Sequence, residues 1–332
     1  MTVTVFWADP HPKLMPFDVV ADALGANGGE LVIGNCETEA DLIEQADACG
    51  AEVILISWRK IGGVAVQNAL PKVRLMIRLG IGYDQIDDDA ATERGIAVGN
   101  CPIYCSTEVA EHTIGLLYAS ARQIVWSHER IREGEWVPAT TEVHRIMGQT
   151  LGLVGFGSIA RKVAWRAQGL GIKVIAYDKY VADDVIREAG VEPVSLDELL
   201  ERSDFVSCHT LLNAGTRRLI GAEQLAKLKP TAYIINTSRG PVIDQQALTE
   251  VLKAGKIAGA AIDVFENEPL EVESELRGLQ NVILTPHQAA TSIEALADLK
   301  TEVAANLVEW IKTDWSPAVR NSEVKGHLRP RM

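Results

Sequence analysis

One pattern fills most of this 332-residue chain: short runs of Val, Ile and Leu alternate with longer segments of helical periodicity. Strands that are apolar on both faces and separated by helices form parallel sheets covered by helices. A first series of expected strands lies at residues 3–7, 31–33, 53–57, 73–77 and 96–99. A second series lies at residues 151–155, 174–177, 205–208, 233–236, 259–263 and 282–284. The pattern therefore predicts an α/β fold, and the length fits two domains.

Helical segments are expected between these strands. The clearest are 38–48, 244–255 and 292–312, a segment that starts at the capping box Ser195-Leu-Asp-Glu198, and a single long helix over 106–132. The acidic run 87–89 suits a helix start, where the helix dipole favours carboxylates. The polar stretch 322–332 reads either as a loose tail or as a packing arm.

Charge and composition exclude several classes of partner. The formal net charge of −13 argues against a nucleic-acid or anionic-membrane surface. No apolar run approaches the ~20 residues of a membrane helix, and the N-terminus lacks a basic region followed by an apolar stretch. The five cysteines show no Cys-x2-Cys pair, so we expect reduced thiols, no metal site and a cytoplasmic protein.

A glycine-rich turn joins the first strand of the second series to a helix. Its sequence is Leu-Gly-Leu-Val-Gly-Phe-Gly-Ser-Ile-Ala over 151–160, which fits G-x-G-x-x-G/A at Gly155, Gly157 and Ala160. Such a turn lets the backbone approach a pyrophosphate, which the helix N-terminus then binds. Asp178 ends the next strand about 20 residues further on, where an acid binds the adenosine ribose hydroxyls. The carboxylate would repel a 2′-phosphate, so we predict NAD, an argument that Lys179 weakens slightly.

Three later segments carry charged or titratable side chains beside strand ends. They contain Arg239, then Asp263, Glu266 and Glu268, then His287. Carboxyl ends of parallel strands meet at one edge, so these segments should converge. A guanidinium for a carboxylate, a histidine for a proton and an acid behind the imidazole are what hydride transfer to a 2-oxo acid requires.

These residues, with their surroundings, resemble the D-isomer-specific 2-hydroxyacid dehydrogenase family. GFGSIA with Asp178, INTSRGPVID, DVFENEP and TPH occur in the family's order, and the likeness runs from about residue 75 to 292. Within the family, RLGIGYDQID and IYCSTEVAEH resemble the group that includes the C-terminal-binding proteins. The resemblance implies two Rossmann-like domains: a dinucleotide-binding domain over 104–286, and a discontinuous, flavodoxin-like substrate domain over 1–103 and 287–332.

The resemblance also implies roles for individual residues. Arg239, Glu268 and His287 match the catalytic arginine, the acid of the dyad and the acid/base, and Glu266 is then a solvated acid. Arg78, Ile81 and Gly82 match substrate-binding positions. The cofactor-binding positions, together with the glycine turn and Asp178, are Ser158, Ile159, Thr210, Thr216, Thr237 and Asp263. By the same resemblance we expect a homodimer through the NAD domain, with the helix over 106–132 as the contact.

Two departures from the family pattern are visible. No proline follows His209 within two residues, and Ala290 stands where the C-terminal-binding proteins carry a tryptophan. His209 reads equally well as a packing residue or a cofactor residue, and His112 reads as structural. The predicted function is NAD(H)-linked interconversion of a 2-oxo acid and a (D)-2-hydroxy acid. The alternative is an NADH-responsive binding protein of the C-terminal-binding-protein type.

Overall fold

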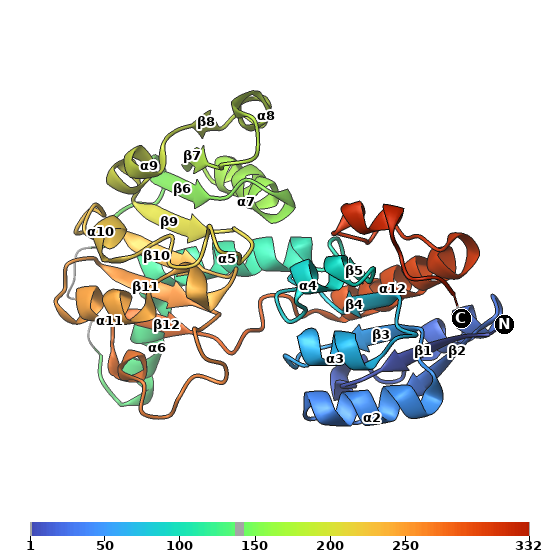
Figure 1. The fold of residues 1–332 in the computed structure, drawn as a ribbon. Coiled ribbons are helices and arrows are strands. Elements are labelled where there is room, and N and C mark those ends of the chain that lie inside the picture. The colour runs from blue at the N-terminus through green and yellow to red at the C-terminus, as the bar shows by residue number, and fades with distance from the viewer. Residues whose placement is uncertain (1, 137–142, 332) are drawn as a thin grey trace. The chain divides into compact units, whose positions relative to one another are not determined.

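The computed structural model describes residues 2–136 and 143–331. The chain forms two compact units (Figure 1). Unit 1 consists of Met1–Cys105 and Thr291–Met332, and unit 2 of Ser106–Ala290. These limits lie two and four residues beyond the domain boundaries expected from the sequence, because the linker after 99 continues to Cys105 and the loop after 284 continues to Ala290.

Unit 1 is built on a five-stranded parallel sheet. Its strands, in the order β2-β1-β3-β4-β5, are β1 (Val3–Trp7), β2 (Gly29–Ile33), β3 (Val53–Ile56), β4 (Leu75–Arg78) and β5 (Ala97–Gly99). Its helices are α1 (Asp18–Gly25), α2 (Glu39–Cys49), α3 (Val64–Ala69), α4 (Asp88–Glu93) and α12 (Ile293–Thr313). This strand order is that of flavodoxin-like sheets, as predicted.

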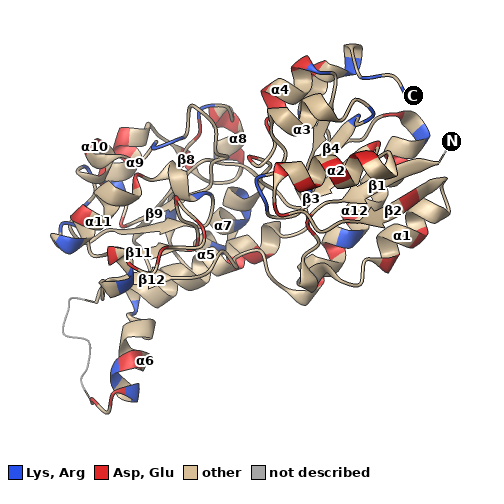
Figure 2. Ribbon diagram, turned by 60° about the horizontal axis from the view of Figure 1, so that its bottom comes forward, with Lys and Arg blue, Asp and Glu red and all other residues tan. Residues whose placement is uncertain are grey.

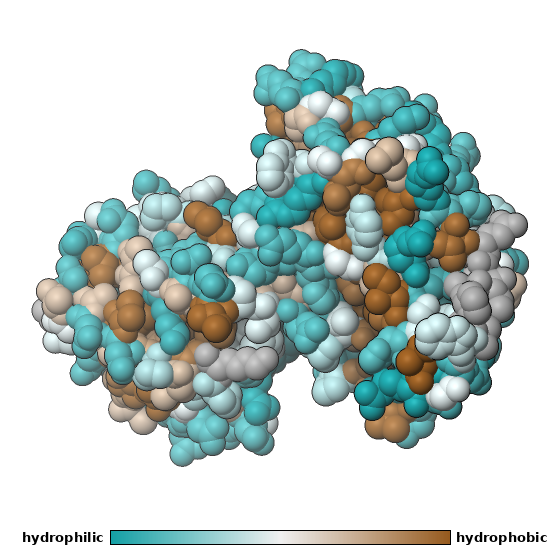
Figure 3. All heavy atoms as spheres, turned by 180° about the vertical axis from the view of Figure 1, so that it is seen from behind, coloured by the Kyte–Doolittle hydropathy of each residue, from teal (hydrophilic) through white to brown (hydrophobic). Residues whose placement is uncertain are grey.

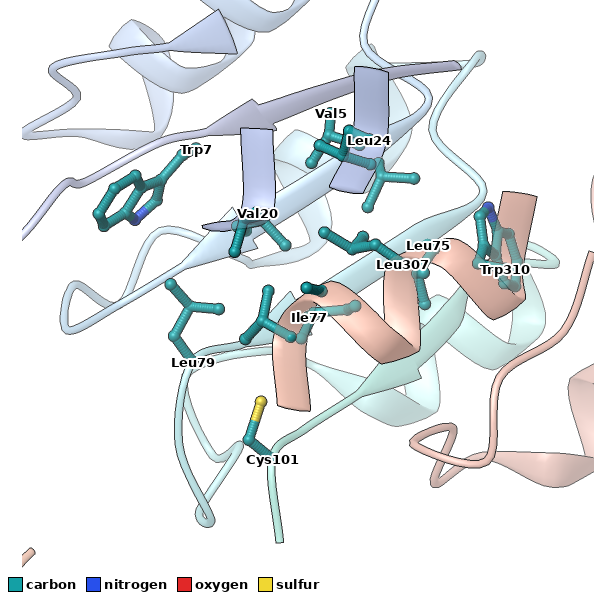
Figure 4. Packing of buried hydrophobic residues seen from close by; sticks show 14 of the residues in the cluster. Val5, Trp7, Val20, Leu24, Leu75, Ile77, Leu79, Cys101, Leu307 and Trp310 are labelled. Atoms are coloured by element: carbon teal, nitrogen blue, oxygen red, sulfur yellow. The ribbon is translucent and has the colours of Figure 1, made fainter. Parts of the chain in front are cut away.

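Both faces of the unit 1 sheet are buried, because successive strand residues point to opposite sides. Val5 and Trp7 pack with α1 and α12 in one cluster, whereas Phe6 packs with α2 and α3 in another. Figure 4 shows the first cluster, in which Leu307 and Trp310 of α12 lie against Leu75 of β4. The late helix α12 thus completes a sheet built almost entirely from the first hundred residues.

Unit 2 contains a seven-stranded parallel sheet. In the order β12-β11-β10-β9-β6-β7-β8, its strands are β6 (Thr150–Val154), β7 (Lys173–Tyr177), β8 (Glu192–Pro193), β9 (Phe205–Cys208), β10 (Tyr233–Asn236), β11 (Gly259–Ile262) and β12 (Val282–Leu284). Its helices are α5 (Ser106–Ala121), α6 (Ile124–Arg132), α7 (Ser158–Gly169), α8 (Asp183–Glu188), α9 (Leu196–Arg202), α10 (Ala222–Leu225) and α11 (Gln245–Lys253). The order from β8 to β11 is the 3-2-1-4-5-6 order of Rossmann folds, which confirms the predicted fold class.

The unit 2 sheet also has a core on each face. Phe205 and Ile235 pack with α5 and α7, whereas the adjacent Val206 and Ile234 pack with α9, α10 and α11. Because each strand is apolar on both sides, the sheet is fixed from both faces. The polar residues that follow the strands are therefore held by a rigid frame.

One expected helix is in fact two. The sequence predicts a single helix over 106–132, but the chain turns at Gln123, whose φ is +51°, between α5 and α6. No glycine or proline marks this break; the Gln123 side chain instead hydrogen-bonds to Tyr233 of β10. A tertiary contact therefore overrides a continuous helical pattern.

The C-terminal stretch is a packing arm rather than a loose tail. After the short 3₁₀ turn Ser322–Gly326, the Arg329 guanidinium donates to the backbone carbonyls of Gln67, Leu70, Val73 and Arg94 at 2.7–3.0 Å. Arg74 in turn donates to the Arg329 carbonyl at 2.6 Å. The arm thus fastens the end of the chain to α3, α4 and the loop before β4.

Candidate active site

The glycine-rich turn connects β6 to α7. Gly155 has a φ of +98°, and a Cβ there would lie 2.9 Å from the carbonyl carbon and oxygen of His209, so only glycine fits. Ala160 is fully buried between the helix and the sheet. The turn therefore has the tight backbone and close helix packing that its sequence predicts.

The start of α7 is open for a ligand. A Cβ at Gly157 would meet nothing within 4 Å, and no side chain caps the first turn of this twelve-residue helix. The N–H groups of Ser158 and Ile159 belong to that uncapped turn. Free N–H groups and the positive end of the helix dipole suit a pyrophosphate. These residues therefore fit a dinucleotide, and Gly155, Gly157, Ser158 and Ile159 would hold its phosphates.

Asp178 follows β7 directly, beside this turn. Its Oδ2 accepts from Phe156 N at 2.7 Å, and its Oδ1 accepts from Tyr180 N at 2.8 Å and Val181 N at 3.0 Å. Three backbone donors thus fix the carboxylate next to the phosphate-binding turn. This is the placement expected of an acid that binds adenosine ribose hydroxyls.

Arg239 follows β10, in a segment pressed against the loop that carries the acids. A Cβ at Gly240 would lie only 1.9 Å from the Phe265 carbonyl carbon, so a glycine is required at that contact. The Asn236 side chain donates to the Arg239 carbonyl at 2.9 Å and fixes the turn. The guanidinium itself donates to the Ser238 carbonyl at 2.9 Å.

His287 and Glu268 form a hydrogen-bonded pair. Nδ1 of His287, after β12, lies 2.7 Å from Oε2 of Glu268, after β11, and each side chain is about one-third exposed. The Phe265 N–H donates to the other Glu268 oxygen at 3.0 Å. Because Nδ1 faces a carboxylate, it carries a hydrogen, and Nε2 is the nitrogen left to exchange a proton with a substrate.

The charge state of Glu268 follows from its neighbours. Burial alone would raise the pKa of Glu268, but the hydrogen bond and charge of His287, the Phe265 N–H and the charge of Arg239 together hold the pKa below its usual value. The carboxylate is therefore ionised at neutral pH and accepts the Nδ1 hydrogen of His287. Of the two acids weighed from the sequence, Glu268 contacts His287, whereas Glu266 lies near Arg218.

Asp263 is fully buried at the end of β11. It accepts from the Thr285 hydroxyl at 2.5 Å, from Gln288 N at 3.0 Å and from Ala289 N at 3.0 Å. Burial would raise the pKa of Asp263, but the nearby His112 and the hydrogen bonds from Thr285 and these N–H groups lower it. Both carboxylate oxygens therefore bind the loop that carries His287, and a contact with the nicotinamide stays a prediction.

The three threonines expected at the cofactor differ in their surroundings. Thr210 lies beside Gly155, and its buried hydroxyl has no hydrogen-bond partner among the described residues. Thr216 donates to the Leu211 carbonyl at 2.5 Å and thereby closes its own turn. The Thr237 hydroxyl lies 2.9 Å from that of Thr113 on α5. Thr210 and Thr237 follow β9 and β10, at the same edge of the sheet as the glycine turn.

His209 ends β9 next to Gly155. Its Nε2 lies 2.9 Å from the Ser207 hydroxyl, and burial lowers the pKa of His209 to about 4. The ring is therefore neutral at physiological pH. It packs under the turn and cannot supply a positive charge to a phosphate.

The residues expected to bind substrate lie in unit 1. Arg78 ends β4, is 6% exposed, and donates to the Leu79 carbonyl at 3.1 Å. A Cβ at Gly80 would overlap its guanidinium, so Gly80 leaves room for that side chain. Asn100 donates to the Ile81 carbonyl at 2.5 Å, which fixes the loop that also contains Gly82. These three predicted residues therefore cluster at the carboxyl end of β4.

Within unit 2 the structure brings together Arg239, Glu268 and His287, and separately the glycine turn with Asp178. The link from His112 on α5 to Thr285 and Asp263 could not be predicted from the sequence, because the partners are more than 140 residues apart and share no local pattern. Among residues 2–136 and 143–331, no group of three or more His, Cys, Asp or Glu side chains is arranged to bind a metal ion. No helix in the described part of the chain has the length and apolar character needed to cross a membrane.

Comparison with known proteins gives the same assignment as the motifs. Residues 114–289, more than half of the chain, match the family described as D-isomer specific 2-hydroxyacid dehydrogenase, NAD binding domain. A glyoxylate reductase of Korarchaeum cryptofilum is 42% identical, over 85% of this chain and 86% of that protein. A D-3-phosphoglycerate dehydrogenase of Methanocaldococcus jannaschii is 39% identical, over 92% of this chain but only 59% of that longer protein.

A solved structure gives the same result over nearly all of the chain. The glyoxylate reductase from Paecilomyes thermophila superposes with a TM-score of 0.86 at 32% identity, covering 96% of this chain and 98% of that one. The likeness to the C-terminal-binding proteins in particular stays a prediction. Fold, motifs and relatives agree on an enzyme that interconverts a 2-oxo acid and a 2-hydroxy acid with a nicotinamide dinucleotide. The chain belongs to the D-isomer-specific 2-hydroxyacid dehydrogenase family.

Proposed function

We propose that His287 is the acid/base of this dehydrogenase, that Glu268 is its partner and that Arg239 binds the substrate carboxylate. The observation that carries the proposal is the 2.7 Å contact between His287 Nδ1 and Glu268 Oε2, with Arg239 near enough to help lower the pKa of Glu268. A proton donor and a cation, both close to Glu268, match the two polar groups of a 2-oxo acid.

The reaction then divides between the cofactor and the protein. The reduced nicotinamide, when bound, supplies a hydride to C2 of the 2-oxo acid. His287 Nε2 gives its proton to the keto oxygen, so that a hydroxyl forms and no charged alkoxide is left. Glu268 keeps the imidazole oriented and stabilises its protonated form. In the oxidative direction, His287 takes the hydroxyl proton back.

Substrate binding rests on arginine side chains. The Arg239 guanidinium offers two parallel donors, which match a carboxylate better than a single ammonium does. We propose that Arg78, with backbone groups of Ile81 and Gly82, also binds substrate, which makes unit 1 (1–105 and 291–332) the substrate domain. The names of the relatives support glyoxylate as the first substrate to test.

We also propose a preference for NAD over NADP, carried by Asp178. Replacing it by Asn keeps an acceptor oxygen for the N–H of Phe156 but removes the charge. A single like-charge repulsion of about 1 kcal/mol corresponds to roughly fivefold, so the ratio of kcat/KM for NADH to that for NADPH should fall by about that factor. Asp178→Ala should lower the ratio similarly while weakening the turn. A wild-type enzyme that already prefers NADPH would contradict this reading.

We propose further that unit 2 forms a homodimer through α6. This helix buries none of its residues within the chain, and Ile124 and Ile131 are each more than half exposed (Figure 2 shows the helix extending away from the sheet). Other apolar residues of unit 2 are exposed as well, and Figure 3 shows apolar patches on this unit. Light scattering should give twice the chain mass, and Ile131→Asp should give a monomer. A cytoplasmic location stays a prediction from the sequence.

The test of the proposed function is a substrate panel. NADH consumption is followed by absorbance with glyoxylate, pyruvate and bulkier 2-oxo acids, and product chirality is then determined. We expect turnover of at least one 2-oxo acid to a (D)-2-hydroxy acid. NADH binding without turnover across the panel would contradict the proposal and favour a binding protein.

A further inference from the structure

A second histidine of unit 2 contacts the loop that carries His287. Nε2 of His112, in the middle of α5, lies 3.2 Å from the Thr285 hydroxyl and 3.6 Å from Oδ1 of Asp263. Its side chain is 22% exposed, whereas that of Asp263 is 1% exposed. An early helix thus reaches two residues that follow β11 and β12.

The direction of each hydrogen bond in this group can be assigned. Asp263 is an acceptor with a lowered pKa, so the Thr285 hydroxyl gives it its single hydrogen at 2.5 Å. That hydroxyl then has only acceptor capacity left for a neighbour. Nε2 of His112 must therefore be the protonated nitrogen, and it donates to Thr285.

The buried carboxylate organises the loop after β12. Asp263 accepts from the N–H groups of Gln288 and Ala289, and the N–H of His287 donates to the Asp263 carbonyl at 2.8 Å. His287 has a φ of +47°, a conformation that a non-glycine residue keeps only where its surroundings impose it. The hydrogen bonds from the N–H groups of His287, Gln288 and Ala289 to Asp263 impose this conformation.

We propose that His112 is a positioning residue for the reaction: by donating to Thr285 it holds that hydroxyl on Asp263, and so keeps the loop in the conformation that places His287 against Glu268. His112 touches neither the dyad nor the proton that is transferred. The inference rests on the proposed role of His287, and it adds a partner from a different element.

Three single variants test the role of the donor. His112→Leu removes the hydrogen bond and should lower kcat by about 10- to 100-fold, the usual cost of a misplaced catalytic group, while KM for the 2-oxo acid and Kd for NADH change little. His112→Gln keeps an N–H donor and should recover most of kcat. Ser120→Ala is the control, because it removes a buried hydroxyl of the same helix that has no hydrogen-bond partner among the described residues. Melting temperatures verify that each variant is folded.

A double variant separates this inference from the proposed function. If His112 acts through His287, His112→Leu should cost almost nothing further in a His287→Ala background. Equal losses from His112→Leu in both backgrounds would overturn the inference and leave the role of His287 intact. Equal kcat for His112→Leu and wild type would also overturn it. Near-normal activity of His287→Ala alone would instead overturn the proposed function.

Discussion

At the scale of single residues, the site depends on side chains whose backbone is fixed before any ligand binds. Gly240 allows the Arg239 segment to lie against the backbone of Phe265, and Asp263 fixes the loop of His287. Arg239 and His287 are thereby each placed by a neighbouring residue. Substitutions that keep charge but change shape are therefore the most informative.

Arg239→Lys should keep the positive charge and still lose most of the activity toward 2-oxo acids. A lysine cannot reproduce the two parallel donors, and a charge-assisted hydrogen bond is worth about 1.5–3 kcal/mol, so kcat/KM should fall by roughly ten- to a hundredfold. Steady-state kinetics on one good substrate measures it. The matched control is Arg218→Lys at an exposed arginine, which should be neutral. Wild-type kcat/KM in Arg239→Lys would mean that the carboxylate is bound elsewhere.

Because of His209, the free energy of unfolding of the cofactor-free enzyme should decrease as the pH falls into the mildly acidic range. Burial lowers its pKa to about 4 from the ordinary 6.5, so the unfolded chain takes up this proton first as the pH falls. The contribution of His209 to stability is complete above pH 6.5 and is lost progressively between about 6.5 and about 4. Melting curves of wild type and His209→Gln without cofactor should show a shallower decline for the variant in this window. Parallel declines would contradict the assignment of a buried neutral ring.

At the scale of elements, local signals in the sequence predicted the starts of helices well. The capping boxes at Thr38 and Ser195 and the caps at Asp87 and Ser292 all begin helices, because a side-chain oxygen binds the first free N–H groups. The break at Gln123 could not be predicted, since its cause is a contact with β10. The role of His112 was missed for the same reason: α5 lies far in sequence from Asp263 and Thr285.

The C-terminal arm offers a stability prediction at this scale. Arg329→Ala removes a hydrogen-bond donor from four backbone carbonyls of unit 1 and should reduce the free energy of unfolding by about 2–4 kcal/mol. Arg331→Ala is the matched control two residues away, because it removes only ion pairs with Glu52 and Asp314 and should cost less than about 1 kcal/mol. Urea unfolding followed by circular dichroism compares them. Equal midpoints for the two variants would show that the arm does not stabilise unit 1.

At the scale of the whole molecule, the alternation of strands and helices predicted two parallel sheets, and both strand orders agree with it. The chain returns to unit 1 only at Thr291, so α12 packs on strands formed some 200 residues earlier. Apolar periodicity cannot indicate that the chain returns to its first domain. The discontinuous domain was expected only from the family resemblance. The proposed substrate residues and the proposed catalytic residues accordingly belong to different units.

The most direct test of the central claim is single-turnover reduction of a good 2-oxo acid by NADH in wild type and in His287→Ala. We expect the variant to bind NADH with an unchanged Kd, since the imidazole acts on the substrate. We also expect a hydride-transfer rate lower by about 10²–10⁴-fold, the usual contribution of a positioned proton donor. A rate within a few-fold of wild type, with NADH binding intact, would contradict the assignment of His287 as the acid/base.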